Sequence, residues 1–345
     1  MKVLYLLKEE LSILQNKKIL KVIKSITHNP WYNLALEEEL FNQIKDNEII
    51  LYLWQNENTV VIGRNQNPWR ECRLNDLEKD GGKLARRLSG GGAVFHDLGN
   101  LNFTFIMKDK LYDINKQLQI IIDAVNKLGI EAKFSGRNDI LVNGKKFSGN
   151  AFYYDEDRCY HHGTLLVAAD MMKLAKYLKV SKEKIKSKGI KSVEARVANL
   201  QEINPQVTIE RLGDALVESF METYNEDISS YIIKDENINE LKNIYDKYAS
   251  WKWRYGDTPN FEIEFYNRFN FGDIELKLNL KDGYIEEVVV YSDAMDSKLI
   301  LDIQKSLKSI RFTKDDIITK LDTLKETYNK EIIKSIQTWI NDRNF

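Results

Sequence analysis

The chain of 345 residues contains only two cysteines, Cys72 and Cys159, which stand far apart in the sequence. This spacing fits neither a disulfide framework nor a thiolate metal site, and it is typical of a protein kept in a reducing compartment. The sequence also lacks an excess of charge of one sign, because 51 Lys and Arg residues are balanced by 52 Asp and Glu residues. A net charge of −1 gives no general attraction to nucleic acid, so we expect no DNA or RNA partner.

Long hydrophobic runs are absent as well. The apolar segment Val3–Leu7 is interrupted by Lys8-Glu9-Glu10, well short of a membrane span or a secretory signal. We therefore expect a cytoplasmic protein that makes no membrane contact. The sequence also contains no internal repeat and no low-complexity tract. Its length favours two domains, and 43% hydrophobic residues can fill two ordinary cores.

Glycine is concentrated in one part of the chain. Of the 17 glycines, 12 lie between Gly63 and Gly163, and three consecutive ones follow Arg86-Arg87-Leu88-Ser89. The run Gly90-Gly91-Gly92 disfavours a helix or strand and favours a turn with positive φ or a close approach to a ligand. Backbone N–H groups in such a turn can bind an anion, and the two arginines would add full charges. A glycine-rich hairpin loop with solvated arginines explains the segment equally well, and the absence of a following Lys-Ser or Lys-Thr excludes a Walker loop.

Helical and strand patterns alternate along the chain. The pattern predicts helices at Trp31–Ile44 and at Ile114–Leu128, where Gly129 ends the apolar stripe. This mixture predicts an α/β (α+β) fold with a substantial sheet. Further helices are predicted around Thr208–Tyr224 and Asn237–Ser250, and the pattern breaks at Trp251–Pro259. A second unit is predicted after this break. It consists of strands near Phe261–Phe269, Ile274–Leu280 and Tyr284–Tyr291, a turn at Asp282-Gly283 and two amphipathic helices.

The pair Asn143-Gly144 between two extended segments predicts a tight β-hairpin. Counting across a two-residue loop places Asp139 opposite Ser148 and puts both on the same face as Lys146, whereas Lys145 points to the other face. Lys146 would then contact an anionic ligand, and Asp139 would hold a Mg²⁺ ion beside it. An ordinary surface ion pair is the alternative, and a one-residue bulge would exchange Lys145 for Lys146.

Two adjacent histidines lie on the next predicted strand, Tyr160–Val167. Side chains alternate along a strand, so His162 and Thr164 face together while His161 faces away. Adjacent histidines cannot both reach one metal from a regular strand, and the chain has no companion His or Cys cluster. We expect hydrogen-bonded core or pocket histidines here.

Lysine is dense between Asp170 and Lys191, where eight lysines occur. Most such runs are the solvated surface of a helix, and this is the favoured interpretation. A mobile basic lid over a phosphate is the alternative.

Several motifs, taken together and in this order, resemble those of lipoate–protein ligases. They are Arg86-Arg87-x-Ser89-Gly90-Gly91-Gly92-Ala93-Val94-Phe95-His96-Asp97, Gly136-Arg137-Asn138-Asp139, Lys146-x-Ser148-Gly149-x-Ala151 and His161-His162-Gly163-Thr164, preceded by Trp31-Tyr32-Asn33-Leu34-Ala35-x-Glu37-Glu38, Trp54 and Gly63-Arg64-x-Gln66-Asn67-Pro68-Trp69. The resemblance runs from about Lys18 to the C-terminal unit. The hairpin is shorter than in the familiar bacterial form, and Leu88 replaces a small polar residue.

The resemblance implies a large catalytic domain built on a mixed β-sheet flanked by helices, as in the biotin/lipoate ligase fold. This domain would span residues 1–250, with 1–17 as an N-terminal extension, followed by a linker at 251–258 and a small C-terminal α/β accessory domain at 259–345. The implied activity joins free lipoate to ATP, forming lipoyl-AMP and pyrophosphate with Mg²⁺. The lipoyl group then passes to a lysine of an acceptor lipoyl domain, on 2-oxoacid dehydrogenase E2 subunits or on the glycine cleavage H protein.

Site residues follow from the same resemblance. Lys146 is implied to contact both lipoate and the nucleotide phosphate, and a lid is implied that ends at Ser192–Val197. Contacts to ATP are implied for Arg87, Gly92, Ala93, Val94 and Phe95, and a lipoate slot is implied near Leu34, Trp54, Arg87, Ser89, His96, His162 and Thr164.

Two other functions are compatible with parts of the sequence. An octanoyl or lipoyl transferase of related fold works through a cysteine thioester without ATP, and Cys159 is the candidate thiol near the motifs. A non-catalytic lipoate-binding paralogue is the second alternative, against which the presence of Lys146 and Asp139 argues.

Overall fold

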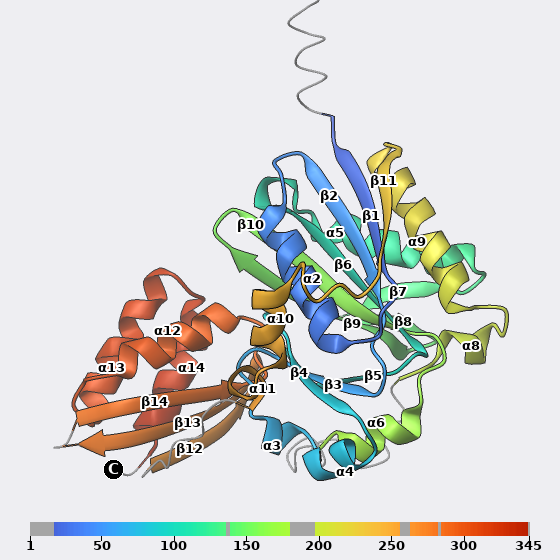
Figure 1. Ribbon diagram of the computed structural model, residues 1–345. Coiled ribbons are helices and arrows are strands. Elements are labelled where there is room, and N and C mark those ends of the chain that lie inside the picture. The colour runs from blue at the N-terminus through green and yellow to red at the C-terminus, as the bar shows by residue number, and fades with distance from the viewer. Residues whose placement is uncertain (1–16, 136–138, 180–196, 256–262, 282–283, 344–345) are drawn as a thin grey trace, which may run out of the picture.

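The computed structural model describes residues 17–135, 139–179, 197–255, 263–281 and 284–343 (Figure 1). Within these ranges a large sheet carries helices on both faces, and a smaller α/β unit follows it in the chain. The expected mixed α/β architecture is confirmed. No helix in the described ranges is both long and apolar enough to cross a membrane.

Eight strands form the large sheet in the order β11-β1-β2-β6-β10-β9-β8-β7. Strand β1 is parallel to β2 and β11, and every other neighbouring pair is antiparallel. The strands are β1 (Ile19–Ser25), β2 (Glu48–Trp54), β6 (Asn100–Lys108), β7 (Ala132–Ser135), β8 (Asp139–Val142), β9 (Lys145–Asp155), β10 (Arg158–Leu166) and β11 (Ile228–Lys234).

One face of this sheet packs on two amphipathic helices, α5 (Ile114–Lys127) and α9 (Ile209–Tyr224). The Asp113 side chain caps the first turn of α5, and Thr208 does the same for α9. Gly129, at φ 76°, follows the end of α5 as the sequence predicted. Alternate residues of the strands fill the core under these helices, because side chains of a strand point to opposite faces in turn.

The opposite face is covered by α2 (Pro30–Gln43), α10 (Lys242–Ala249) and a small sheet in the order β4-β3-β5. The predicted helix at Asn237–Ser250 begins later than expected, at Lys242. The small sheet consists of β3 (Thr59–Ile62), β4 (Lys83–Arg86) and β5 (Val94–His96), and short helices flank it: α3 (Pro68–Glu71), α4 (Leu74–Lys79), α6 (Met171–Tyr177) and α11 (Trp251–Tyr255). The short helix α8 (Leu200–Ile203) lies on the other side of the large sheet, where Leu200 joins the core under α5 and α9.

The C-terminal unit has its own hydrophobic core, between a three-stranded antiparallel sheet and three helices. Two helices were expected, and three are found because Thr313 and Asn329 each cap a new helix. The predicted turn at Asp282-Gly283 lies outside the described residues. The elements are β12 (Ile263–Phe269), β13 (Gly272–Lys281), β14 (Tyr284–Ser292), α12 (Ser297–Leu307), α13 (Lys314–Asp322) and α14 (Lys330–Asn341).

Candidate functional site

A cavity that is open to solvent lies between the large and the small sheet. Strands β2, β6, β9 and β10 line it from the large sheet, and β3 and β5 line it from the small one. It is bordered by Leu34, Trp54, Val61, Arg87, Gly91, Gly92, Ala93, Val94, His96, Asn102, Lys146, Gly149, Asn150, Ala151, His162, Gly163, Thr164 and Met295. Most of the residues implied by the resemblance are therefore brought together in one place.

The Arg87 guanidinium, at the rim of the cavity, holds the glycine loop. It donates to the carbonyl oxygens of Gly90 and Gly92, each at 2.8 Å, and to Ser89 Oγ at 3.0 Å. Burial lowers the pKa of Arg87 to about 10, so the side chain is still charged at neutral pH. A fixed positive charge thus lies beside the loop, as the arrangement of arginine and glycine predicted.

Arg86 does not share this position. Its guanidinium donates to three backbone carbonyl oxygens of residues 63–66 and to those of Trp253 and Arg254. Burial and the nearby charge of Arg64 lower the pKa of Arg86 to about 9. The expectation that both arginines flank a bound anion is therefore wrong for Arg86, which ties α11 to the small sheet. Strand β4 ends at Arg86, so Arg87 already belongs to the loop that follows the strand.

The glycine loop also touches the C-terminal unit. The Gly91 N–H donates to Ala294 O at 3.1 Å, and Gly91 has φ 88°. A methyl group added to Gly90 would lie 2.3 Å from the same carbonyl oxygen. Two of the three glycines are thus required by backbone geometry, and the next residue, Met295, borders the cavity from the other unit.

The hairpin places Lys146 in the cavity and leaves Lys145 exposed. Its turn is the predicted two-residue one, with Asn143 at φ 50° and Gly144 at φ 75°. A bulge adds Phe147 on β9, so Asp139 lies opposite Gly149 and not opposite Ser148. The prediction that Ser148 shares a face with Lys146 is therefore wrong: Ser148 lies on the face of the sheet that packs against α5 and α9.

Lys146 and Asp139 nevertheless meet on the cavity side, because the bulge lies between them and not between Lys146 and the turn. Lys146 Nζ lies 2.6 Å from Asp139 Oδ1, and both side chains are partly exposed. Val197, the one residue of the predicted lid end that is described, pairs with Lys146 in a short parallel bridge. The rest of the lysine-rich segment, residues 180–196, lies outside the described residues.

A buried hydrogen-bond chain runs along the floor of the cavity. His162 Nδ1 lies 2.9 Å from Glu37 Oε1, and His162 Nε2 lies 2.7 Å from Ser89 Oγ. Ser89 also accepts from Arg87, so the chain connects a buried carboxylate to a buried guanidinium. Ser89 itself is fully buried behind the lining residues. Glu37 belongs to one of the motifs that carry the resemblance, but no role was implied for it. Nothing in the sequence indicates that it contacts His162.

His96 borders the cavity next to Trp54, with the two rings in an edge-to-face contact at 6.0 Å between centroids. Burial, together with the nearby charge of Arg87, lowers the pKa of His96 to about 3. The imidazole is therefore neutral near pH 7. The resemblance implied a slot residue, and this is where the structure places His96.

The remaining predicted residues divide into two groups. Leu34, Trp54 and Thr164 border the cavity, as do Gly92, Ala93 and Val94. The side chain of Phe95 instead packs in the core of the small sheet against Tyr177. His161 faces the side of the sheet covered by α5 and α9, and its ring nitrogens form hydrogen bonds with the side chains of Gln117 and Asn150.

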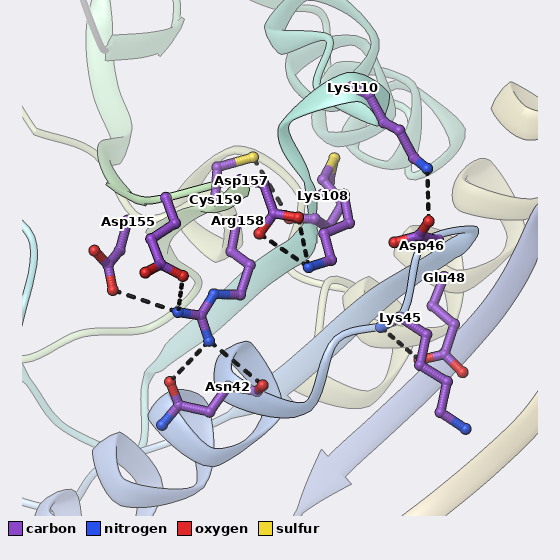
Figure 2. Close-up of polar contacts among 12 residues, drawn as sticks. Asn42, Lys45, Asp46, Glu48, Lys108, Lys110, Asp155, Asp157, Arg158 and Cys159 are labelled. Carbon is purple, nitrogen blue, oxygen red and sulfur yellow. Dashed lines mark hydrogen bonds and ion pairs between the residues drawn. The ribbon is translucent and has the colours of Figure 1, made fainter.

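Cys159 lies on the face of β10 that packs against α5 and α9, and it does not border the cavity. Its Sγ donates to Met107 O at 3.6 Å, next to the ion pairs of Asp157 and Arg158 (Figure 2). Burial raises the pKa of the Cys159 thiol to about 12, so the thiolate is scarce at neutral pH. A thioester mechanism through this residue is not supported by its position.

Some lining residues had no signal in the sequence. Asn102 comes from near the start of β6, and Met295 comes from another unit some 200 residues further along the chain. Among the described residues no three His, Cys, Asp or Glu side chains gather in a way that would hold a metal ion by themselves.

Comparison with known proteins gives two family matches along the chain. Residues 29–221 match the family model of the lipoyl protein ligase A/B catalytic domain, and residues 258–340 match that of the bacterial lipoate protein ligase C-terminus. A lipoate–protein ligase A of Psychrobacter cryohalolentis is 47% identical over 317 residues, which is 90% of this chain and 94% of that protein.

Solved structures agree with these matches. The crystal structure of P. falciparum LipL1 in complex with lipoate has a TM-score of 0.84 and 36% identity, covering 94% of this chain and all of that one. A lipoate–protein ligase A bound with ATP has a TM-score of 0.60 and 27% identity over 70% of this chain and 99% of that one. A bipartite lipoate protein ligase from Thermoplasma acidophilum, described with its E2 lipoyl domain, has a TM-score of 0.62 and 28% identity over 72% of this chain and all of that one.

Proposed function

This chain belongs to the lipoate–protein ligase family, and on that premise we propose that it activates lipoate with ATP and transfers the lipoyl group to a lysine of an acceptor lipoyl domain. The relatives support both substrates, since one similar structure contains lipoate and another contains ATP. The proposal extends to the mechanism and to the residues that carry it.

The observation that carries the proposal is a single cavity with the Lys146 ammonium at one end and the Trp54 ring at the other. Trp54 lies opposite Asn102, Asn102 opposite Thr164, and Thr164 opposite Gly149, so four neighbouring strands form one row. Three spacings of about 4.8 Å give a row about 14 Å long, which accommodates an extended eight-carbon acid. Lys146 stands over the Gly149 end of the row.

In the first half-reaction, a lipoate carboxylate oxygen attacks the α-phosphorus of ATP and pyrophosphate leaves. Two anions must approach each other, so the barrier depends on fixed positive charge and N–H dipoles. Lys146 would bridge the carboxylate and the α-phosphate, and the N–H groups of Gly92–Phe95 would face the nucleotide. Arg87 would keep that loop in place and add its charge. Lipoyl-AMP is the product.

Asp139 is the described residue that would hold Mg²⁺ here. Mg²⁺ in nucleotide sites takes one or two carboxylates, with phosphate oxygens and water completing its shell. A single carboxylate fits this pattern, and the lack of a three-residue cluster in the described ranges does not conflict with it. The ion would screen the phosphate charges when bound. Asp139 also fixes the Lys146 ammonium at 2.6 Å.

In the second half-reaction, the ε-amine of an acceptor lysine attacks the lipoyl carbonyl carbon and AMP leaves. The amine must lose a proton, and an unperturbed lysine near pH 7 is neutral in only about one molecule in 2,500. Proximity to Arg87 and Lys146 would favour the neutral amine. We propose acceptor lipoyl domains of 2-oxoacid dehydrogenase E2 subunits and of the glycine cleavage H protein, the former in line with the bipartite ligase described with its E2 lipoyl domain.

The test is to incubate the purified protein with lipoate, Mg²⁺ and an E2 lipoyl domain or H protein, with and without ATP, and to weigh the acceptor by mass spectrometry. We expect one lipoyl group on the acceptor lysine, with pyrophosphate and AMP released, only when ATP is present. Transfer from an acyl-carrier thioester without ATP would instead establish a transferase. Lipoate binding without pyrophosphate exchange would establish a non-catalytic protein.

A further inference from the structure

The protonated nitrogen of the neutral His96 ring can be assigned from its neighbours. Asn33 Nδ2 donates to the backbone carbonyl oxygens of Thr27 and Gln55, at 3.1 and 2.8 Å, and carbonyl oxygens only accept. The same nitrogen faces Asn56 Oδ1 at 3.0 Å, which leaves Asn56 Nδ2 to face His96 Nδ1 at 3.2 Å. His96 Nδ1 must accept this bond, so the single ring proton is on Nε2.

That Nε2–H has no partner among the described residues, although His96 is only 3% exposed and borders the cavity. Buried donors are nearly always satisfied in native proteins, so an orphaned one beside a substrate cavity indicates a bond made to the substrate. His96 lies against Trp54, at the end of the row remote from Lys146. The donor therefore meets the far end of the acyl chain and not its carboxylate.

Asn102 places a second unsatisfied polar atom at this end. Its Oδ1 accepts from Asn100 Nδ2 at 2.9 Å, and its Nδ2 has no partner among the described residues. Turning both amides around reverses the bond and leaves the Asn102 oxygen unpaired instead. One polar atom of Asn102 is thus unsatisfied in either arrangement, which is unexpected for a slot built for a saturated hydrocarbon.

We infer that His96 Nε2–H donates to a sulfur at the far end of the acyl substrate and so makes the site prefer a sulfur-bearing acid over saturated octanoate. The inference rests on the proposed function. Thioether and disulfide sulfurs are weak acceptors, whereas the end of octanoate has none. A site with a buried donor disfavours the analogue that leaves this donor unpaired.

The test uses three straight-chain acids of nearly equal length: octanoate, 6-thiaoctanoate and 4-thiaoctanoate. The sulfur of 6-thiaoctanoate occupies a position that carries sulfur in lipoate, and 4-thiaoctanoate carries its sulfur nearer the carboxylate. We expect kcat/KM in ATP–pyrophosphate exchange to be about fivefold higher for 6-thiaoctanoate than for the other two, the effect of one modest hydrogen bond. In His96→Phe this advantage should disappear.

Leu34→Met is the matched control, because it alters a lining side chain that has no donor. It should shift kcat/KM for all three acids together. Equal kcat/KM for 4- and 6-thiaoctanoate in the unaltered protein overturns the inference, whether or not His96→Phe folds. An undiminished preference in a folded His96→Phe variant overturns it too. Failure of every acid, lipoate included, to support exchange would overturn the proposed function instead.

Discussion

Replacing Lys146 by alanine is expected to abolish adenylate formation with little effect on folding. The Lys146 side chain is 35% exposed, and its described charge partner is Asp139 at 2.6 Å. An ion pair that solvent reaches this well contributes less than about 1 kcal/mol to stability. The free energy of unfolding of Lys146→Ala should therefore fall by no more than that amount.

Activity should fall much further, because in the proposed mechanism this ammonium compensates the charge of two approaching anions. Two unit charges about 4 Å apart interact by about 4 kcal/mol at an effective dielectric constant near 20. Removing one preorganised donor from a developing negative charge typically costs a factor of about 10² to 10³ in kcat. The variant also leaves the Asp139 carboxylate facing the phosphates, so we expect a loss in kcat/KM of at least about 10³-fold.

The assay is ATP–pyrophosphate exchange with lipoate, with Lys145→Ala as the matched control. Lys145 is on the other face of β9 and is exposed, so most activity should remain. Lys146→Arg should restore little, since a planar fork replaces a compact ammonium. Comparable near-complete losses in both alanine variants would refute the hairpin register on which the reasoning depends.

Three further predictions concern buried residues. Arg86→Leu should lower the unfolding free energy by at least about 3 kcal/mol in urea titrations, because it removes charge-assisted bonds to five carbonyl oxygens; a loss under 1 kcal/mol contradicts a tethering role. Cys159→Ser should retain ATP-dependent lipoylation, and trapping an acyl adduct on Cys159 during turnover would disprove the adenylate mechanism. The depressed pKa of His96, about 3 against about 6.5 when unfolded, means that its stabilising contribution is complete above about pH 6.5 and lost as pH falls, by about 1.4 kcal/mol per pH unit. Between pH 7 and pH 5.5 the free energy of unfolding should fall by about 1 kcal/mol more in the unaltered protein than in His96→Phe. Parallel pH dependences of the two proteins would contradict this prediction.

The hairpin shows how far local sequence could predict the site. Asn143-Gly144 specified the turn, because both residues adopt positive φ there. The register next to the turn followed, and with it the choice of Lys146. The bulge at Phe147 did not, because it depends on packing that side chain into the core beneath α5 and α9. The position of Ser148 was therefore predicted on the wrong face.

The face on which each residue of β10 lies was easier to predict, because side chains alternate along the whole length of a regular strand. His162 and Thr164 border the cavity, while Cys159 and His161 belong to the opposite face. No such rule was available for Arg86 and Arg87, because β4 ends between them and the chain enters the glycine loop. The arginine–glycine motif indicated an arginine beside the glycine loop. Only the three-dimensional structure shows that Arg87 holds this loop and that Arg86 ties α11 to the small sheet.

The glycine run has more than one cause, and the sequence revealed only one of them. The predicted turn accounts for positive φ at Gly91, but Gly90 is small because the backbone of Ala294 and Met295 approaches it closely. Contacts between segments about 200 residues apart leave no periodic pattern near either segment. Met295 consequently borders the cavity without any local motif to announce it. The requirement for glycine thus combines two demands, the positive φ of the turn at Gly91 and the close approach of the C-terminal unit at Gly90, and a substitution in this run tests both at once.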